Sequence, residues 1–122
     1  MESTKPSPAD LGRRGEDLAA DYLEERGLAV LSRNWRGREG ELDIVASDGE
    51  RLVICEVKTR AGPNWGEPGE VLTRRQRRRL RRAALEWLAV HRVPWCEVRF
   101  DLVAVLWPPD APARVEHREG VF

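Results

Sequence analysis

Three charged residues, Asp43, Glu56 and Lys58, stand in segments where the other residues are mostly apolar. Asp43 lies within Glu-Leu-Asp-Ile-Val-Ala, and Glu56 and Lys58 flank Val57 in Cys-Glu-Val-Lys-Thr. Carboxylate oxygens are the ligands that Mg²⁺ prefers in proteins, and a lysine ammonium is a common phosphate ligand. Two carboxylates and a lysine on one sheet therefore indicate a site for a divalent cation and a phosphate.

The segment that carries these charges is predicted to form two strands joined at Asp48-Gly49, a dipeptide typical of two-residue hairpin turns. Such a turn would pair Asp43 with Ile54 and Glu41 with Glu56. Side chains alternate between the two faces of a strand, and a slip of one residue would separate Asp43 from Glu56. The charged side chains expected on one face are Glu41, Asp43, Glu56 and Lys58.

A structural explanation of the same residues is also open. Glu56 and Lys58 could form an exposed ion pair, with Asp43 paired to an arginine. Exposed ion pairs contribute only about 0–1 kcal/mol, so they would not explain charges set between apolar strand residues. Spacing alone leaves both interpretations standing.

The elements that must position these residues fit into one domain. The chain has 122 residues, of which 41% are hydrophobic and 34% charged, which is typical of a globular protein with one core. We expect a flexible tail over residues 1–8 and a single domain over 9–122. No apolar run approaches membrane-spanning length and no signal-peptide core is visible, so we expect a cytoplasmic protein with no membrane contact.

Hydrophobic periodicity predicts a helix, three antiparallel strands, a second helix and a further strand. The expected ranges are a helix over 8–26, strands over 28–35 and within the 40–59 hairpin, a helix from Thr73 to 91, a strand over 96–107 and a short edge strand over 113–118. Residues 61–69 are rich in Gly and Pro, which predicts a loop. Trp65 in that loop could cover the site, stack on a base or pack on the core.

The second predicted helix concentrates positive charge, although the formal net charge of the chain is +0. Seven arginines fall within residues 74–82, and the nearest acid in the helix is Glu86. A solvated face is the ordinary explanation of a charge run, but arginine without lysine favours phosphate contact, because a guanidinium group binds two oxygens at once. The arginines expected to hold a nucleic-acid backbone are Arg60, Arg74, Arg75 and Arg78.

Each predicted helix also offers one polar residue outside the hairpin. Gln76 lies four residues before Leu80, so it should face the buried side of its helix. Glu16 lies one turn before Ala19, at the edge of an apolar stripe; the pattern alone favours an exposed carboxylate. Gly15 beside it is costly in a helix and indicates a close approach of backbone at that point.

Cysteines and histidines give no further site. Cys55 and Cys96 have no metal-ligand spacing and are expected to be buried free thiols. His91 and His117 have no ligand-spaced neighbour, so we expect them at a helix end or on the surface, with no role.

With its elements in this order, the chain resembles the PD-(D/E)xK nuclease superfamily, and more closely the YraN-like family of predicted endonucleases. The resemblance covers nearly the whole chain after residue 10, and its six matching stretches in order are specific. Those stretches are Gly15-Glu16, Arg33–Arg36, Gly40–Val45, Glu56–Arg60, Gln76–Leu88 and Arg99–Val103. The resemblance implies an α+β, restriction-endonuclease-like fold with an αβββαβ core, in which helices flank a central mixed sheet. Leu42 stands where the signature has proline, a position that varies.

The resemblance also implies roles for individual residues. Asp43 and Glu56 match the ligands of a divalent cation, Mg²⁺ or Mn²⁺, and Lys58 matches the lysine that orients or activates the attacking water. Glu16 matches a metal ligand on the first helix of archaeal junction-resolving nucleases, which reverses the expectation from the pattern. Gln76 is similar to a helix glutamine near the site.

The function that follows from the resemblance is metal-dependent hydrolysis of phosphodiester bonds in nucleic acid. We expect the substrate to be DNA rather than RNA, and branched or structured DNA is included. A non-catalytic nucleic-acid-binding module of the same fold is the alternative, and a domain that binds an acidic protein is a third. Junction-cutting relatives work as dimers, and the apolar region over residues 95–107 could serve as the interface of a homodimer.

Overall fold

The computed structural model describes residues 7–61 and 72–121, which contain two helices and five strands. The elements are α1 (Pro8–Glu25), β1 (Ala29–Arg36), β2 (Glu41–Ser47), β3 (Leu52–Arg60), α2 (Arg74–Val90), β4 (Val98–Leu106) and β5 (Arg114–Arg118). The predicted α+β order is confirmed, including the short strand at the end. Most of the expected tail, and the expected loop with Trp65, lie outside the described residues.

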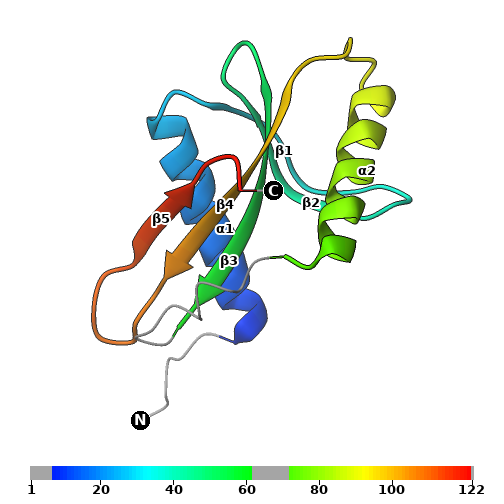
Figure 1. Ribbon diagram of the computed structural model, residues 1–122. Coiled ribbons are helices and arrows are strands. Elements are labelled where there is room, and N and C mark those ends of the chain that lie inside the picture. The colour runs from blue at the N-terminus through cyan, green and yellow to red at the C-terminus, as the bar shows by residue number, and fades with distance from the viewer. Residues whose placement is uncertain (1–6, 62–71, 122) are drawn as a thin grey trace.

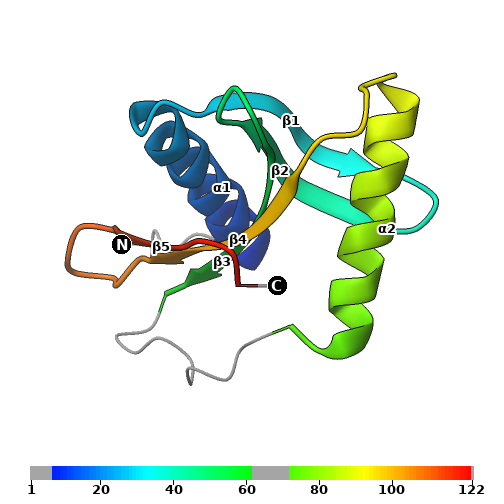
Figure 2. The same cartoon turned by 45° about the horizontal axis from the view of Figure 1, so that its top comes forward.

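The five strands form one mixed sheet in the order β1-β2-β3-β4-β5. Neighbouring strands are antiparallel, except for β3 and β4, which are parallel and are connected through α2. Figures 1 and 2 show α1 across one face of the sheet and α2 against the other. The predicted edge strand is β5, at the opposite end of the sheet from β1.

Both helices begin at capping residues that the sequence makes available. Ser7 accepts the backbone N–H of Asp10 at 3.2 Å, and proline occupies the first turn of α1. The predicted cap Thr73 accepts the N–H of Gln76 at 3.1 Å, and the Gln76 side-chain oxygen accepts the N–H of Thr73 at 2.7 Å. This reciprocal pair is a capping box, which satisfies two backbone donors at the start of α2.

The core has two parts, one on each face of the sheet. Against α1 lie Ala19, Ala20, Leu23, Ile44, Ala46, Val53, Cys55, Val103 and Val105. Against α2 lie Leu42, Val45, Leu52, Ile54, Leu72, Leu80, Ala83, Ala84, Trp87, Leu88 and Phe100. Alternate residues of β3 belong to different parts, as the alternation of a strand requires. Cys55 is a buried free thiol, as expected, whereas Cys96 is free but only partly buried.

The turn between β2 and β3 is longer than the two-residue hairpin predicted at Asp48-Gly49. Ser47 pairs with Leu52, and the turn begins at Asp48 and ends at Arg51. The Asp48 carboxylate accepts the backbone N–H groups of Glu50 and Arg51 at 2.9 and 2.6 Å. An aspartate that bonds its own turn in this way stabilises the longer connection.

The predicted pairing of the two strands was therefore wrong by two residues. Ile54 pairs with Val45 and not with Asp43. A slip of two residues is one full period of a strand, so Val45 and Ile54 keep their predicted face. Leu42 does not: alternation places it on the opposite face, but it packs against α2 with them. Continued past its last pair, the observed register brings Asp43 opposite Glu56.

Strand β1 turns towards α2 near its end. Arg33 reaches α1, where its guanidinium donates to Asp17 at 2.6 Å, but Trp35 packs against the α2 side of the core. Two residues of a regular strand would share a face; here Asn34 between them has a φ of 51°. Asparagine tolerates this left-handed conformation better than most residues. The turn between β1 and β2 is thereby directed towards α2.

No helix within residues 7–61 and 72–121 is both long and apolar enough to cross a membrane.

Candidate active site

Asp43 lies where β2 separates from β3. The last residue pair between the two strands is Ile44 with Cys55. One residue further, the Asp43 carboxylate accepts the backbone N–H of Val57 at 2.9 Å. Beyond the last strand pair, the Asp43 side chain thus forms the next hydrogen bond to β3. This bond holds the Asp43 carboxyl group next to Glu56.

Asp43 and Glu56 interact strongly because both are largely removed from water. Burial, then the charge of Asp43, raises the pKa of Glu56 from 4.5 to about 7, and its side chain is only 17% exposed. Burial, followed by the charges of Glu16 and Glu41, raises the pKa of Asp43, against the lowering effect of the Val57 N–H. The Asp43 carboxyl group lies close enough to Glu56 for its charge to raise the pKa of Glu56. They repel when both are ionised, so a shared proton or a cation stabilises the pair.

Lys58 completes the group on the same face of β3. Its ammonium nitrogen lies 3.7 Å from the Glu56 carboxylate, and its side chain is about one-third exposed. Both side chains open into a cavity of about 170 Å³ between the sheet and the start of α2. The cavity is lined by Gly40, Glu41, Glu56, Lys58, Leu72, Gln76, Arg79 and Leu80.

The two helix residues expected at the site contribute less directly than predicted. Gln76 lines the cavity but is exposed, so its predicted burial was wrong: its side-chain oxygen turns back to cap α2. Glu16 is partly buried and its charge reaches Asp43. Within the described part of the chain, however, no three His, Cys, Asp or Glu side chains are gathered closely enough to form a ready metal cluster. The structure brings Asp43 and Glu56 together, with Glu16 at longer range.

Glu16 owes its position to the glycine before it. Gly15 is buried against Thr59 of β3, and a Cβ atom at Gly15 would overlap the Thr59 side chain, 2.8 Å from its Cγ2. The predicted close approach at Gly15 is confirmed, with a side chain as the neighbour. Helix α1 thereby lies directly on the strand that carries Glu56 and Lys58.

The four predicted phosphate-binding arginines are not all in one place. Arg75 and Arg78, exposed on the first turns of α2, line a second hollow next to the cavity. Arg74 is exposed and lines neither hollow. Arg60 is partly buried at the end of β3 and donates to the Thr59 carbonyl at 3.3 Å.

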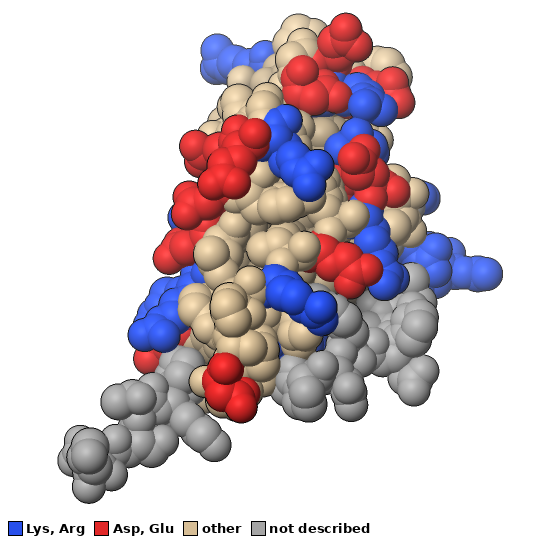
Figure 3. Space-filling model, turned by 90° about the vertical axis from the view of Figure 1, so that its left-hand side faces the viewer, with Lys and Arg blue, Asp and Glu red and all other residues tan. Residues whose placement is uncertain are grey.

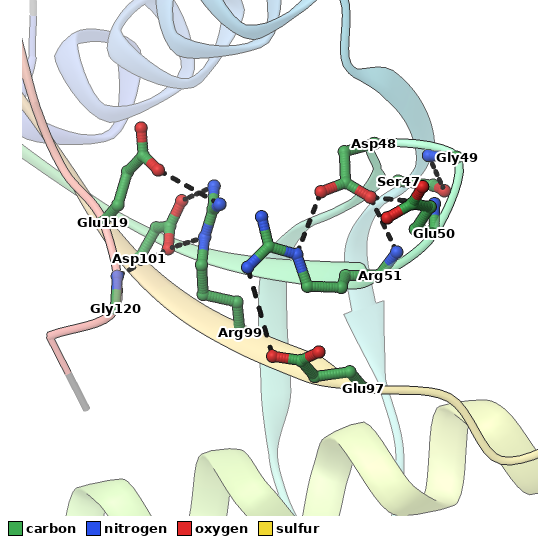
Figure 4. A network of polar contacts seen from close by, with 10 residues as sticks. All are labelled: Ser47, Asp48, Gly49, Glu50, Arg51, Glu97, Arg99, Asp101, Glu119 and Gly120. Carbon is green, nitrogen blue, oxygen red and sulfur yellow. Dashed lines mark hydrogen bonds and ion pairs between the residues drawn. The ribbon is translucent and has the colours of Figure 1, made fainter.

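A buried cluster around Asp101 was missed by sequence reasoning (Figure 4). Asp101 is fully buried and accepts two bonds from Arg99, at 2.9 and 2.8 Å, and one from the Gly120 N–H at 3.0 Å. His117 lies 2.7 Å from the same carboxylate with its side chain 8% exposed, so its predicted surface position was wrong. Burial alone would raise the pKa of Asp101, but these bonds hold it below its usual value. The cluster fastens β5 and the segment after it to β4, and lines neither hollow.

The donor set at Asp43 and Glu56 fits a divalent cation. Two adjacent carboxyl groups provide oxygen ligands, and Mg²⁺ commonly keeps several waters, so one or two protein carboxylates are enough. The ammonium of Lys58 next to Glu56 adds a contact for a phosphate oxygen.

Comparison with known proteins places the chain in a family. The model of "Uncharacterised protein family UPF0102" matches residues 15–105. A UPF0102 protein of Frankia alni is 52% identical over 112 residues, which cover 92% of this chain and 93% of that protein. One from Acidothermus cellulolyticus is 47% identical and covers 100% of both chains. Among solved structures, Hjc of Archaeoglobus fulgidus, a Holliday junction resolvase, has a TM-score of 0.44 at 21% identity, covering 86% of this chain and 75% of that one. The chain belongs to the UPF0102 family, the YraN family that its sequence motifs resemble.

Proposed function

We propose that this protein is a metal-dependent endonuclease that hydrolyses phosphodiester bonds of nucleic acid at Asp43, Glu56 and Lys58. One observation carries the proposal: the carboxyl groups of Asp43 and Glu56 lie together where β2 leaves β3, with the Lys58 ammonium 3.7 Å from Glu56. Two buried carboxyl groups side by side, each with a raised pKa, are costly to maintain without a cation, so such a pair indicates function more than stability.

Each residue has a defined task in this chemistry. Asp43 and Glu56 would hold Mg²⁺ or Mn²⁺, and the Val57 N–H keeps the Asp43 carboxylate in its orientation. When bound, the cation supplies a Lewis acid that polarises the phosphodiester and lowers the pKa of water. Lys58 would position the attacking water or stabilise the negative charge that grows on the phosphate.

The substrate we propose is DNA before RNA, with branched or structured DNA included. The preference rests on the motifs that the chain shares with PD-(D/E)xK nucleases. The cavity offers arginine and lysine side chains, which contact phosphates and do not read base sequence on their own.

One observation favours a second candidate, a nucleic-acid-binding module that does not cut. In residues 7–61 and 72–121 no third acidic side chain joins Asp43 and Glu56 as a ready ligand. With its pKa near 7, Glu56 could hold a proton in place of a cation. The nuclease requires Asp43 for cleavage, whereas the binding module cleaves nothing with or without Asp43.

A cleavage assay separates these candidates. End-labelled branched, single-stranded and duplex DNA would be incubated with Mg²⁺ or Mn²⁺ and with wild type, Asp43→Ala or the control Asp21→Ala, which removes an exposed carboxylate from α1. We expect metal-dependent cleavage by wild type and Asp21→Ala, and a loss of at least about 100-fold in Asp43→Ala, as for removal of one transition-state-stabilising group.

Cleavage by Asp43→Ala at the wild-type rate would refute the proposed site, provided that its thermal melt shows a folded protein. Tight, metal-independent binding without cleavage by any variant would instead support the binding module.

A further inference from the structure

A wide hollow of about 690 Å³ lies between the β1–β2 turn and the first half of α2. We call it the arginine groove; the arginines that line it are Arg36, Arg38, Arg75, Arg78, Arg79 and Arg82. The groove and the smaller cavity at the candidate active site share Gly40, Glu41 and Arg79 as lining residues. A basic surface therefore leads directly to the Glu56–Lys58 face.

The positive charge of the arginine groove is only partly neutralised. Arg36 lies 3.6 Å from Glu41, and Arg82 lies 3.9 Å from Glu39, all four being exposed, so these pairs are weak. Within the described ranges, four groove arginines have no ion-pair partner: Arg38, Arg75, Arg78 and Arg79. On another face, seen in Figure 3 from the left-hand side of Figure 1, acidic and basic side chains are interspersed.

One wall of the groove is fixed to α2 by Glu86. Its two carboxylate oxygens accept the backbone N–H of Arg38 at 2.8 and 2.9 Å, and one of them accepts the N–H of Glu39 at 3.2 Å. Gly37 is required for this contact, because a Cβ atom there would lie 2.5 Å from Glu86 Oε1 and from the Trp35 ring. Glu86 thus holds the β1–β2 turn, and its arginines, against the arginines of α2.

We propose that the arginine groove binds the phosphate backbone of the nucleic-acid strand next to the bond to be cut, and that Glu86 is a positioning residue for its β1–β2 wall. The inference rests on the proposed function of the adjacent cavity. Guanidinium groups bind phosphate through two parallel hydrogen bonds, and arginines from two elements can contact successive phosphates. Such contacts fix the position of the strand without reading its sequence.

Fluorescence anisotropy of fluorescein-labelled single-stranded and branched DNA measures binding to the groove. The titration is done in EDTA, so that no metal-dependent cleavage can occur. We expect Arg75→Ala/Arg78→Ala to bind at least about tenfold more weakly than wild type, and its slope of log affinity against log salt to fall by about 1.5, as for two lost phosphate contacts. The matched control is Arg114→Ala/Arg118→Ala, which removes the same charge from β5 at the opposite edge of the sheet.

An equal loss in the control variant would overturn the groove, since net charge alone would then explain binding. The nucleic-acid assignment would also be overturned if the wild type bound labelled poly-glutamate as tightly as DNA and Arg75→Ala/Arg78→Ala lost that binding. The groove would then fit an acidic protein partner.

The role of Glu86 has a test with a distinctive sign. Removing a negative charge beside the groove should by itself tighten DNA binding, but Glu86→Ala is expected to weaken it about threefold or more, by releasing the turn and losing phosphate contacts. Gly37→Ala should weaken binding similarly with no change of charge, and the control Glu116→Ala on β5 should not weaken it. Unchanged or tighter binding by folded Glu86→Ala would overturn the positioning role.

Failure of the groove and failure of the proposed function give different results. DNA binding that depends on Arg75 and Arg78, without cleavage under any metal condition, would leave the groove standing and remove the nuclease. Asp43-dependent cleavage with unaltered affinity in Arg75→Ala/Arg78→Ala would remove the groove alone.

Discussion

Glu56 is the residue whose protonation depends most on its surroundings at the site. Burial and the adjacent Asp43 both favour its neutral form, while Lys58 favours the charged form, and the balance raises the pKa to about 7. In the unfolded chain the same group should titrate near 4.5. A glutamate that is partly protonated near neutral pH can exchange its proton for a cation, which links the charge of the site to its occupancy.

This shift predicts how stability depends on pH in the absence of metal. Between the two pKa values the folded protein holds a proton that the unfolded chain has released, so the free energy of unfolding falls as pH rises through that window. Glu56→Gln should reduce this fall by up to about 3 kcal/mol between about pH 5 and about pH 8. Urea unfolding in EDTA at both pH values measures it, with Glu116→Gln on β5 as the exposed control. The same pH dependence in wild type and Glu56→Gln would contradict the assignment.

Some site residues could be identified from sequence and others could not. Asp43 and Glu56 were visible because charged residues stood among apolar ones. Gln76 was assigned to the buried side of its helix, but a residue at the third position of a helix can fold back as a cap, which periodicity does not show. His117 was missed because its partner, Asp101, lies on another strand.

At the scale of elements, the packing of α1 against β3 determines where the site residues of the helix and the strand lie relative to each other. Gly15 allows the helix to touch Thr59, next to Lys58 on the strand, and places Glu16 towards Asp43. The contact depends on the absence of a single methyl group.

Substitutions of two glycines in α1 should therefore have opposite effects. Gly15→Ala should lower the free energy of unfolding by about 1–3 kcal/mol through overpacking against Thr59, and Thr59→Ala in that background should restore part of the loss. At Gly12 an added Cβ would meet nothing within 4 Å, so Gly12→Ala should instead stabilise the helix by up to about 1 kcal/mol. Denaturant melts of the wild type and these three variants measure this; equal effects at both glycines would contradict the close contact.

The elements themselves followed from periodicity and capping signals, and the order of helices and strands along the chain was predicted correctly. The turn between β2 and β3 was not, because Asp48-Gly49 fits both a two-residue turn and a longer one in which Asp48 bonds the backbone. The predicted faces of the paired residues from Ile44 to Cys55 were unaffected, since the error was an even number of residues, but Leu42 packs on the face opposite to the one predicted.

At the scale of the whole molecule, positive charge is gathered where the candidate site opens. The arginine groove forms only when the β1–β2 turn docks on α2, two segments that are distant in the sequence. A formal net charge of +0 therefore conceals a local basic surface. The run of arginines predicted phosphate contact, but the participation of Arg36 and Arg38 depends on tertiary structure.

The central claim is that Asp43 and Glu56 hold one divalent cation, and a calorimetric titration of Mn²⁺ at about pH 8, where Glu56 is mostly ionised, tests it most directly. Wild type and the control Asp21→Asn should bind Mn²⁺ at one site per chain, more weakly at about pH 6 because the Glu56 proton competes. Asp43→Asn should lose this site while remaining folded. Mn²⁺ binding by Asp43→Asn that equals the wild type, or no binding by the wild type, would contradict the claim.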